Sequence, residues 1–179
     1  HNMPLIIVTG LPCTGKSRFS QDLKVFLESK ECSVVMVNEE SEKVDKSSGY
    51  ANATKEKVTR GVLKGAIDHA LSDKTYVIAD SLNYIKGFRY ELYCMARTCK
   101  TQHCCIYVHC DENVSDSWRS SRKELTGECY NDEIFADLRR RYEMPNERNR
   151  WDCPMFRVDT TPLDIRKANL DKKSAQLSS

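Results

Sequence analysis

Apolar and polar residues alternate along the chain at two spacings. Short, nearly continuous apolar runs have the length of buried strands, and longer stretches between them repeat apolar residues at helical spacing. A parallel sheet with crossover helices requires this alternation, so we expect a three-layer α/β domain with five parallel strands. The strands are predicted at residues 4–10, 33–38, 75–80, 104–110 and 154–159.

Helices are predicted between these strands, and a charged, weakly apolar stretch follows the fourth strand from residue 118. Residues 39–52 are polar and are expected to form a mobile loop. The helices are predicted at residues 17–27, 54–71, 87–98 and 132–142. The apolar positions of the first two are Phe19, Leu23, Phe26 and Leu27, and Val58, Val62, Ile67 and Leu71.

Composition limits the size, partners and setting of the protein. The 179 residues suit one domain, and a formal charge of only +2 means that affinity for nucleic acid has to come from local basic clusters. The nine cysteines include no CxxC pair, and Cys104, Cys105 and Cys110 lie in an apolar run. We expect mostly reduced core thiols and a cytoplasmic protein, with the nucleus as a second location. No apolar stretch reaches membrane-spanning length, so no membrane partner is expected.

The two ends of the chain are expected to lie outside the domain. His1 and Asn2 precede Met3, a suitable initiator, and we interpret them as additions to the natural chain. The start is too short for a signal peptide and runs directly into the first strand. Residues 3–159 form the predicted ATP-binding domain, and the polar residues 160–179 are expected to begin a linker.

The segment between the first strand and the first helix matches the pattern GxxxxGK[ST]. Because a strand enters it and a helix leaves it, backbone N–H groups and a helix N-terminus converge on one anion site. Lys16 places a charge near the β- and γ-phosphates, and the Ser17 hydroxyl can ligate Mg²⁺. The sequence therefore predicts a site for ATP and Mg²⁺ in a kinase-like P-loop fold. The residues expected to contact the nucleotide are Gly10, Leu11, Pro12, Cys13, Thr14, Gly15, Lys16, Ser17 and Arg18.

The alternative for this segment is a glycine-rich turn that binds nothing. Lys16 argues against it, because a buried lysine at a helix start opposes the helix dipole unless an anion compensates its charge. Cys13 is interpreted as a small filler within the loop, with a redox role as the alternative.

Asp80 ends the third predicted strand, where a carboxylate that supports Mg²⁺ would lie beside the phosphate loop. The alternative is an aspartate that merely ends the strand in a turn. Ser81 follows it, at the place where many ATPases have a glutamate that orients water. Intrinsic hydrolysis should then be slow unless another group or a partner completes the site.

Two further pairs of residues are candidates for catalysis. Glu39 and Glu40 lie just past the second predicted strand, and either could accept the proton of the attacking hydroxyl; solvated loop acids are the alternative, and Asp80 could also contribute. Arg119 and Arg122 are three residues apart, so both could point from a lid toward the transferring phosphate. A solvated helix face is the alternative for this pair.

A basic cluster lies between Arg139 and Arg150, where five arginines and two glutamates give a local charge of +3. Tyr142 and Trp151 could offer faces on which a base stacks, so this cluster is the best candidate for contact with RNA. The alternatives are a solvated helix end and a tryptophan that fills the core before the last strand.

Three motifs point to one family. The first is the phosphate loop, the second is Asp80 followed by SLNYIKGFRYEL, and the third is NRWDCPMF at residues 149–156. Together they closely resemble the family of the Elongator-associated regulator killer-toxin-insensitivity protein twelve. The nearest enzyme relative of that family is the kinase that phosphorylates seryl-tRNA for selenocysteine synthesis. The resemblance spans Met3 to about Asp159.

The resemblance implies an ATPase that tRNA stimulates and that supports Elongator in modifying the wobble uridine of tRNA anticodons. It also implies a second, C-terminal tRNA-binding domain after a linker within which this chain stops. Carried over by position, Gly10, Gly15, Lys16 and Ser17 would hold nucleotide and metal, Asp80 would support Mg²⁺, and Arg119 and Arg122 would be lid arginines. Asn83, Tyr84, Lys86 and Arg89 match a family signature, and their individual roles stay open.

Two other functions remain as alternatives. The first is a true phosphotransferase, with Glu39 or Glu40 as base and an RNA or small-molecule hydroxyl as acceptor. The second is a nucleotide-gated binding module, in which ATP orders the lid for a protein partner with little turnover.

Overall fold

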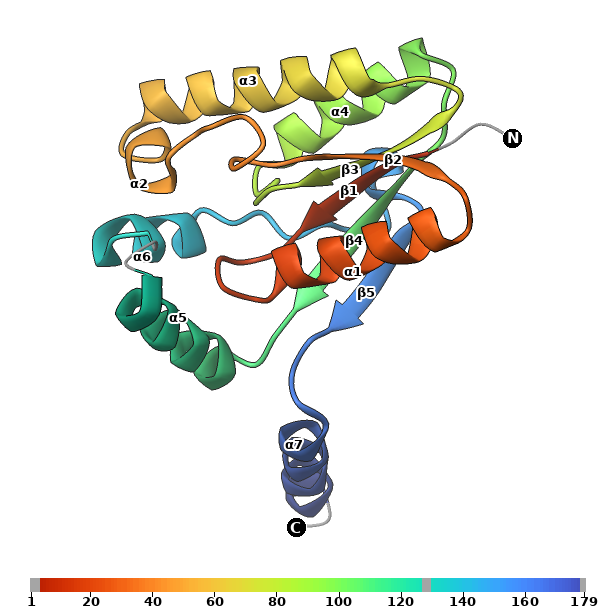
Figure 1. Ribbon diagram of the computed structural model, residues 1–179. Helices are drawn as coiled ribbons and strands as arrows, with labels where there is room; N and C mark the ends of the chain where they lie inside the picture. Colours follow the sequence, from red (N-terminus) through yellow and green to blue (C-terminus); the bar gives the residue numbers. More distant parts are fainter. Residues whose placement is uncertain (1–3, 127–129, 178–179) are drawn as a thin grey trace.

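The computed structural model describes residues 4–126 and 130–177 and shows a central sheet with helices on both faces (Figure 1). The strands are β1 (Leu5–Thr9), β2 (Ser33–Val37), β3 (Thr75–Asp80), β4 (His103–His109) and β5 (Met155–Asp159). The helices are α1 (Lys16–Ser29), α2 (Lys46–Gly49), α3 (Ala53–Ala70), α4 (Lys86–Thr98), α5 (Glu112–Thr126), α6 (Asp132–Arg140), the 3₁₀ helix η1 (Arg150–Asp152) and α7 (Leu163–Leu177).

The strand order brings the ends of three strands together. The sheet has the order β2-β3-β1-β4-β5, and every neighbouring pair is parallel. The predicted five-stranded parallel sheet is therefore confirmed. The register pairs Val8 of β1 with Asp80 of β3, and Thr9 with Tyr107 of β4. Whatever follows Thr9 along the chain must lie between the carboxyl ends of β3 and β4.

Side chains of β1 alternate between the two faces of the sheet, and each face has its own core. Leu5 and Ile7 pack with α3 and α4, where Leu63 and Leu92 are fully covered. Ile6 and Val8 pack with α1 on the other face. Because helices cover both faces, the strands are apolar on both sides, as a parallel sheet requires.

The predicted helix faces were wrong at some positions. Phe26 is 57% exposed, because α1 turns only Phe19, Leu23 and Leu27 toward the sheet. Val58 is 62% exposed, and Val62 also faces solvent. The buried face of α3 carries Glu56, Thr59, Leu63 and Ile67.

Polar residues occupy part of that buried face because each has a partner. Glu56 accepts hydrogen bonds from both terminal nitrogens of Arg141, at 2.6 and 3.1 Å, and one from the Tyr84 hydroxyl. The Thr59 hydroxyl donates to the Gly49 carbonyl at 3.0 Å. A buried polar group that is fully paired costs little, so α3 can turn its valines outward.

Residues 39–52 are more structured than the expected loop. They contain the short helix α2, whose N-cap Asp45 accepts a hydrogen bond from the Ser48 amide at 2.7 Å. Glu39 and Tyr50 are both buried. The polar composition of the segment reflects its capping residues, which favour turns.

Residues beyond 159 contain a helix where the sequence predicted a linker. At the start of α7, Arg166 Nε donates to the carbonyl of Thr161, which lies between β5 and the helix, at 2.8 Å. Asn169 Nδ2 donates to Asp111 Oδ2 at 3.2 Å. The division of the chain at residue 159 stays a prediction.

The eight described cysteines are all free thiols. Burial raises the pKa of Cys104 to about 11 and that of Cys105 to about 12, so both are protonated core residues. Among the helices of the described residues, none is both long and apolar enough to cross a membrane.

Candidate functional site

The phosphate loop connects β1 to α1 at the carboxyl edge of the sheet. Gly10 lies against β4, and a Cβ atom there would stand 2.4 Å from the Val108 carbonyl oxygen, so only glycine fits. Gly15 caps α1 with φ of +84°, a left-handed conformation that glycine adopts without strain. The two glycines thus serve packing at one end of the loop and backbone conformation at the other.

Lys16 begins α1 and is buried at 9% exposure. Its Nζ donates a hydrogen bond to the Leu11 carbonyl at 2.7 Å, within the loop itself. Burial lowers the pKa of Lys16 to about 8, and the charge of Asp80 is the largest effect that opposes this shift. An anion in the loop would compensate this buried charge.

Asp80 lies beside Lys16 at the end of β3. It is 3% exposed, and its Oδ2 has no hydrogen-bond partner among the described residues. Burial raises the pKa of Asp80, and the charge of Lys16 acts against that rise. A buried carboxylate oxygen without a partner is costly unless a cation or a water completes it.

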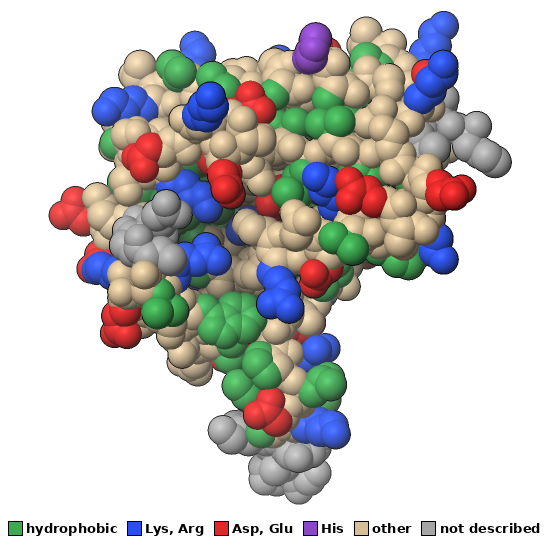
Figure 2. Space-filling view, viewed as in Figure 1, with side chains coloured by type: hydrophobic (Ala, Val, Ile, Leu, Met, Phe, Trp, Pro, Cys, Tyr) green, Lys and Arg blue, Asp and Glu red, His purple; other side chains and the backbone are tan. Residues whose placement is uncertain are grey.

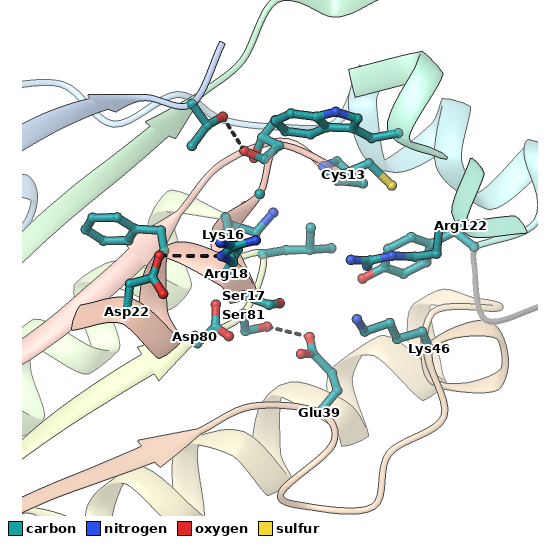
Figure 3. A pocket seen from close by; sticks show the side chains of 18 residues that line it. Cys13, Lys16, Ser17, Arg18, Asp22, Glu39, Lys46, Asp80, Ser81 and Arg122 are labelled. Atoms are coloured by element: carbon teal, nitrogen blue, oxygen red, sulfur yellow. Dashed lines mark hydrogen bonds and ion pairs between the residues drawn. The ribbon is translucent and has the colours of Figure 1, made fainter. Parts of the chain in front are cut away.

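A cavity of about 430 Å³ opens over the phosphate loop (Figure 3). Of the residues predicted to contact nucleotide, 12–18 line it, whereas Gly10 and Leu11 do not. The predicted catalytic residues Glu39, Asp80 and Arg122 also line it. On the surface, Lys and Arg side chains gather around the hollow between α1 and the part of this face formed by α5 and α6 (Figure 2).

The candidate base Glu39 points into the cavity while Glu40 is exposed outside it. Glu39 Oε1 accepts two hydrogen bonds of 2.6 Å, one from the Tyr50 hydroxyl and one from the Ser81 hydroxyl. The structure therefore distinguishes Glu39 from Glu40, whereas the sequence offered either as the candidate base.

The two candidate lid arginines point in different directions. Arg122 reaches the cavity, and so does Trp118, one helical turn earlier on the same face of α5. Arg119 faces α6, where its guanidinium lies 4.2 Å from the centre of the Phe135 ring and forms an ion pair with Asp132. A separation of three residues does not by itself place both side chains at the site, because the partners on α6 hold Arg119 there.

Several lining residues were not singled out from the sequence as site residues. Thr160 follows β5, and its hydroxyl donates to the Thr14 carbonyl at 2.7 Å. Atoms of Trp118 and Thr160 are the nearest to a Cβ built on Gly15, at 3.4 and 3.5 Å. Lys46 and Tyr130 line the cavity from α2 and from the segment before α6. None of them belongs to a motif, and only the tertiary fold brings them to the loop.

Acidic neighbours pair with much of the basic cluster. Arg139 lies 2.8 Å from Glu112, Arg140 lies 2.7 Å from Asp137, and Arg141 is held by Glu56. Tyr142 stacks on Tyr107 and shares a hydrogen bond of 3.0 Å with Thr9, so its ring belongs to the interior. Trp151 packs edge-on against Tyr90. Contact with RNA at this cluster stays a prediction, and its exposed arginines are Arg140, Arg148 and Arg150.

The signature that follows Asp80 fixes the end of β3. Asn83 Nδ2 donates to the Val8 carbonyl at 2.7 Å and to the Ala79 carbonyl at 3.0 Å, which ties β1 to β3. The fully buried Arg89 donates to Asp152 Oδ1 at 2.8 Å and to the Asn83 carbonyl at 2.8 Å. These residues hold the site in place without lining the cavity.

The fold and the loop define a P-loop domain of the kinase-like class. Two solved structures share this fold at low identity: APE1195, with a TM-score of 0.68 and 17% identity, and a gluconokinase from Sinorhizobium meliloti 1021, with a TM-score of 0.56 and 16% identity. Within this class, the family described as chromatin associated protein KTI12 matches residues 3–176. The chain belongs to the KTI12 family.

Individual relatives agree with this assignment. The chain is 44% identical to the KTI12 homolog of Xenopus laevis over 156 residues, which cover 87% of the chain and 56% of that protein. It is 36% identical to KTI12 of Saccharomyces cerevisiae over 170 residues, with 90% and 53% covered. The chain thus spans little more than half the length of these two relatives. Kti12 of Chaetomium thermophilum, solved in complex with ADP-AlF3, matches with a TM-score of 0.81 and 35% identity over 88% of this chain and 89% of that one.

Proposed function

We propose that this chain binds ATP with Mg²⁺ and hydrolyses it, as the nucleotide-binding part of a regulator of Elongator-dependent tRNA modification. The observation that carries the proposal is the presence, at a complete phosphate loop, of a buried Lys16 and a buried Asp80 whose Oδ2 has no hydrogen-bond partner among the described residues. The similar Chaetomium Kti12 was solved with ADP-AlF3, in which aluminium fluoride stands in for the transferring phosphoryl group. Both facts support a triphosphate as the ligand.

The residues present fit a hydrated magnesium ion. No group of three or more His, Cys, Asp or Glu side chains suited to a metal occurs among the described residues. Mg²⁺ needs fewer, because it keeps waters and binds phosphate oxygens in such sites. Ser17 would supply a direct oxygen, and Asp80 would hold a coordinated water. When bound, the ion neutralises charge on the β- and γ-phosphates.

Residues of the chain would bind the phosphates, stabilise charge and accept the proton. Backbone amides of the loop and Lys16 bind the phosphates, and Arg122 stabilises negative charge on the transferring group. Glu39 accepts the proton of the attacking water, since Ser81 provides no carboxylate after Asp80. We expect slow turnover by the chain alone, since Arg119, the second candidate lid arginine, faces α6 and not the cavity.

Partners and location form the finer part of the proposal. We propose that tRNA stimulates the chain, that it associates with Elongator, and that it is located in the cytoplasm and also the nucleus, without membrane contact; these proposals follow from the resemblance of its three motifs to the family. We place the main tRNA contact in a C-terminal domain of the longer relatives, with the segment from Arg139 to Arg150 as a secondary contact.

A phosphotransferase is the second candidate function. Lys46 and Arg122 reach into the cavity from the same side in Figure 3, beyond the phosphate loop, and could hold an anionic acceptor such as RNA. The two functions differ in the fate of the γ-phosphate. ATP labelled at that position should yield free phosphate under our proposal, with and without tRNA; label recovered on RNA would establish the phosphotransferase instead.

A further inference from the structure

Two neighbouring hydroxyls hold Glu39 by the same carboxylate oxygen. We propose that Tyr50 and Ser81 are positioning residues that hold Glu39 as the carboxylate that accepts the proton of the attacking water, an inference that rests on the proposed ATPase function. Both hydroxyls donate to the same oxygen, Oε1, each at 2.6 Å. Neither hydrogen bond engages Oε2, and Figure 3 shows the Glu39 carboxylate across the cavity from the phosphate loop.

Burial strengthens the two hydrogen bonds that Tyr50 and Ser81 donate to Glu39. Glu39, Tyr50 and Ser81 are 5%, 3% and 8% exposed, so little water competes for the hydrogen bonds. Hydrogen bonds to an ionised group are about twice as strong as neutral ones, and a low-dielectric setting strengthens them further. Burial, and then the charge of Glu39, raise the pKa of Tyr50 well above its usual value, so its phenol stays protonated as a donor.

Two separate segments bring the donors to Glu39. On one side, the segment after β2 closes on itself: the Val44 amide donates to the Glu39 carbonyl at 2.8 Å, which curls the segment back toward the cavity. Tyr50 is then fixed by edge-on contacts with the Tyr84 and Tyr130 rings. On the other side, Ser81 directly follows Asp80, the last residue of β3, which fixes its place.

The proposed hydrolysis needs only ATP and water as reactants. The water oxygen bonds to the γ-phosphorus while the bond from that phosphorus to the β–γ bridging oxygen breaks, and ADP leaves with the electron pair. The water proton passes to Glu39 Oε2 and then to solvent. A carboxylate whose Oε1 is fixed by two donors can rotate little, so Oε2 keeps its direction toward the nucleophile.

This arrangement explains how the residue after Asp80 can be a serine. Ser81 contributes no carboxylate, but its hydroxyl holds one that comes from the end of β2. Lys16 from α1 and Asp80 from β3 interact electrostatically with Glu39, and Lys46 and Arg122 line the same cavity. Neither Tyr50 nor Ser81 adds charge, so their proposed effect is on direction.

The test is a double-mutant cycle on ATP turnover and ADP affinity. We expect Glu39→Gln to lower kcat by about 100-fold or more, and Tyr50→Phe and Ser81→Ala to lower it by about tenfold each. The affinity for Mg·ADP should change by no more than about twofold in all three. Ser81→Thr keeps the hydroxyl and should restore most of kcat. In the Glu39→Gln background, Tyr50→Phe and Ser81→Ala should cause no further loss, because the group they position is gone.

Glu40→Gln and Tyr93→Phe are matched controls, since both residues lie outside the cavity, and both should leave kcat unchanged. Losses from Tyr50→Phe that persist in full in the Glu39→Gln background would overturn the positioning role, as would a failure of Ser81→Thr to restore activity in a folded protein. Absence of phosphate release by the unmodified chain would instead overturn the proposed ATPase function, and the positioning role with it.

Discussion

The two ends of the cavity are built in different ways. At one end, the single segment 10–17 supplies main-chain groups and Lys16, and its shape is fixed by its own backbone and by β4. At the other end, Glu39 and Lys46 come from the segment after β2, and Arg122 comes from α5, far along the chain. The groups of the loop come from one segment, whereas the geometry of the side-chain end depends on how separate segments are placed. Binding and turnover should therefore respond to different substitutions.

The largest effect is expected at the loop. Lys16→Ala removes the charge that faces the phosphates, and affinity for ATP should fall by about 100-fold or more. Equilibrium dialysis with labelled ATP measures this. Lys24→Ala is the control: Lys24 lies on the same helix outside the cavity, 3.8 Å from Glu28, and should leave affinity unchanged. Equal affinities for the two variants would show that the loop does not hold the triphosphate.

Gly10 tests how far the loop depends on close packing. Gly10→Ala places a methyl group 2.4 Å from a main-chain oxygen that cannot rotate away, and the free energy of unfolding should fall by about 1–3 kcal/mol. Gly61→Ala is the matched control, because nothing lies within 4 Å of the added Cβ in α3; it should raise stability by about 0.5–1 kcal/mol. Urea unfolding compares the two, and equal midpoints would contradict the packing argument.

At the side-chain end, the two arginines of α5 should behave differently. Arg122→Ala should lower kcat by about tenfold, because the side chain lines the cavity. Arg119→Ala should leave kcat unchanged and cost about 1 kcal/mol of stability, since it removes the contacts with Phe135 and Asp132. The reverse pattern, measured by phosphate release and calorimetry, would place the lid function on Arg119.

The smallest effect is spectroscopic. Trp118 stands beside Gly15, and Trp151 lies against Tyr90 away from the cavity. In a Trp151→Phe variant, Mg·ADP should change the emission of the remaining Trp118, because a charged ligand enters its surroundings. In a Trp118→Phe variant the emission should not respond. A response from Trp151 alone would indicate that nucleotide binding acts on the other end of the fold.

The same contrast explains what the sequence could predict. The loop is contiguous, so its motif could be recognised, and the parallel order of strands was enough to place Asp80 beside it. Tyr50 and Lys46 could not be assigned, because their direction depends on how residues 39–52 close on themselves. The direction of Arg119 depends on Phe135 and Asp132, which no spacing rule connects to it.

The prediction of which helix face is buried was wrong in α3 for a related reason. Val58 and Val62 have helical spacing, but so have Glu56 and Leu63 on the opposite face. Apolar periodicity favours the valines, whereas the structure buries Glu56 because Arg141 and Tyr84 satisfy its oxygens. Partners that arrive from distant segments decide whether a polar side chain can be buried, and the local pattern does not contain them.

Calorimetric titration of the chain with Mg·ATP tests the central claim most directly. If the cavity over the phosphate loop is a triphosphate site, the titration should show binding of one ATP per chain, and saturating ligand should raise the melting temperature. The Lys16→Ala variant should show neither effect. An unmodified, folded chain that gives no heat and no thermal stabilisation would contradict the account.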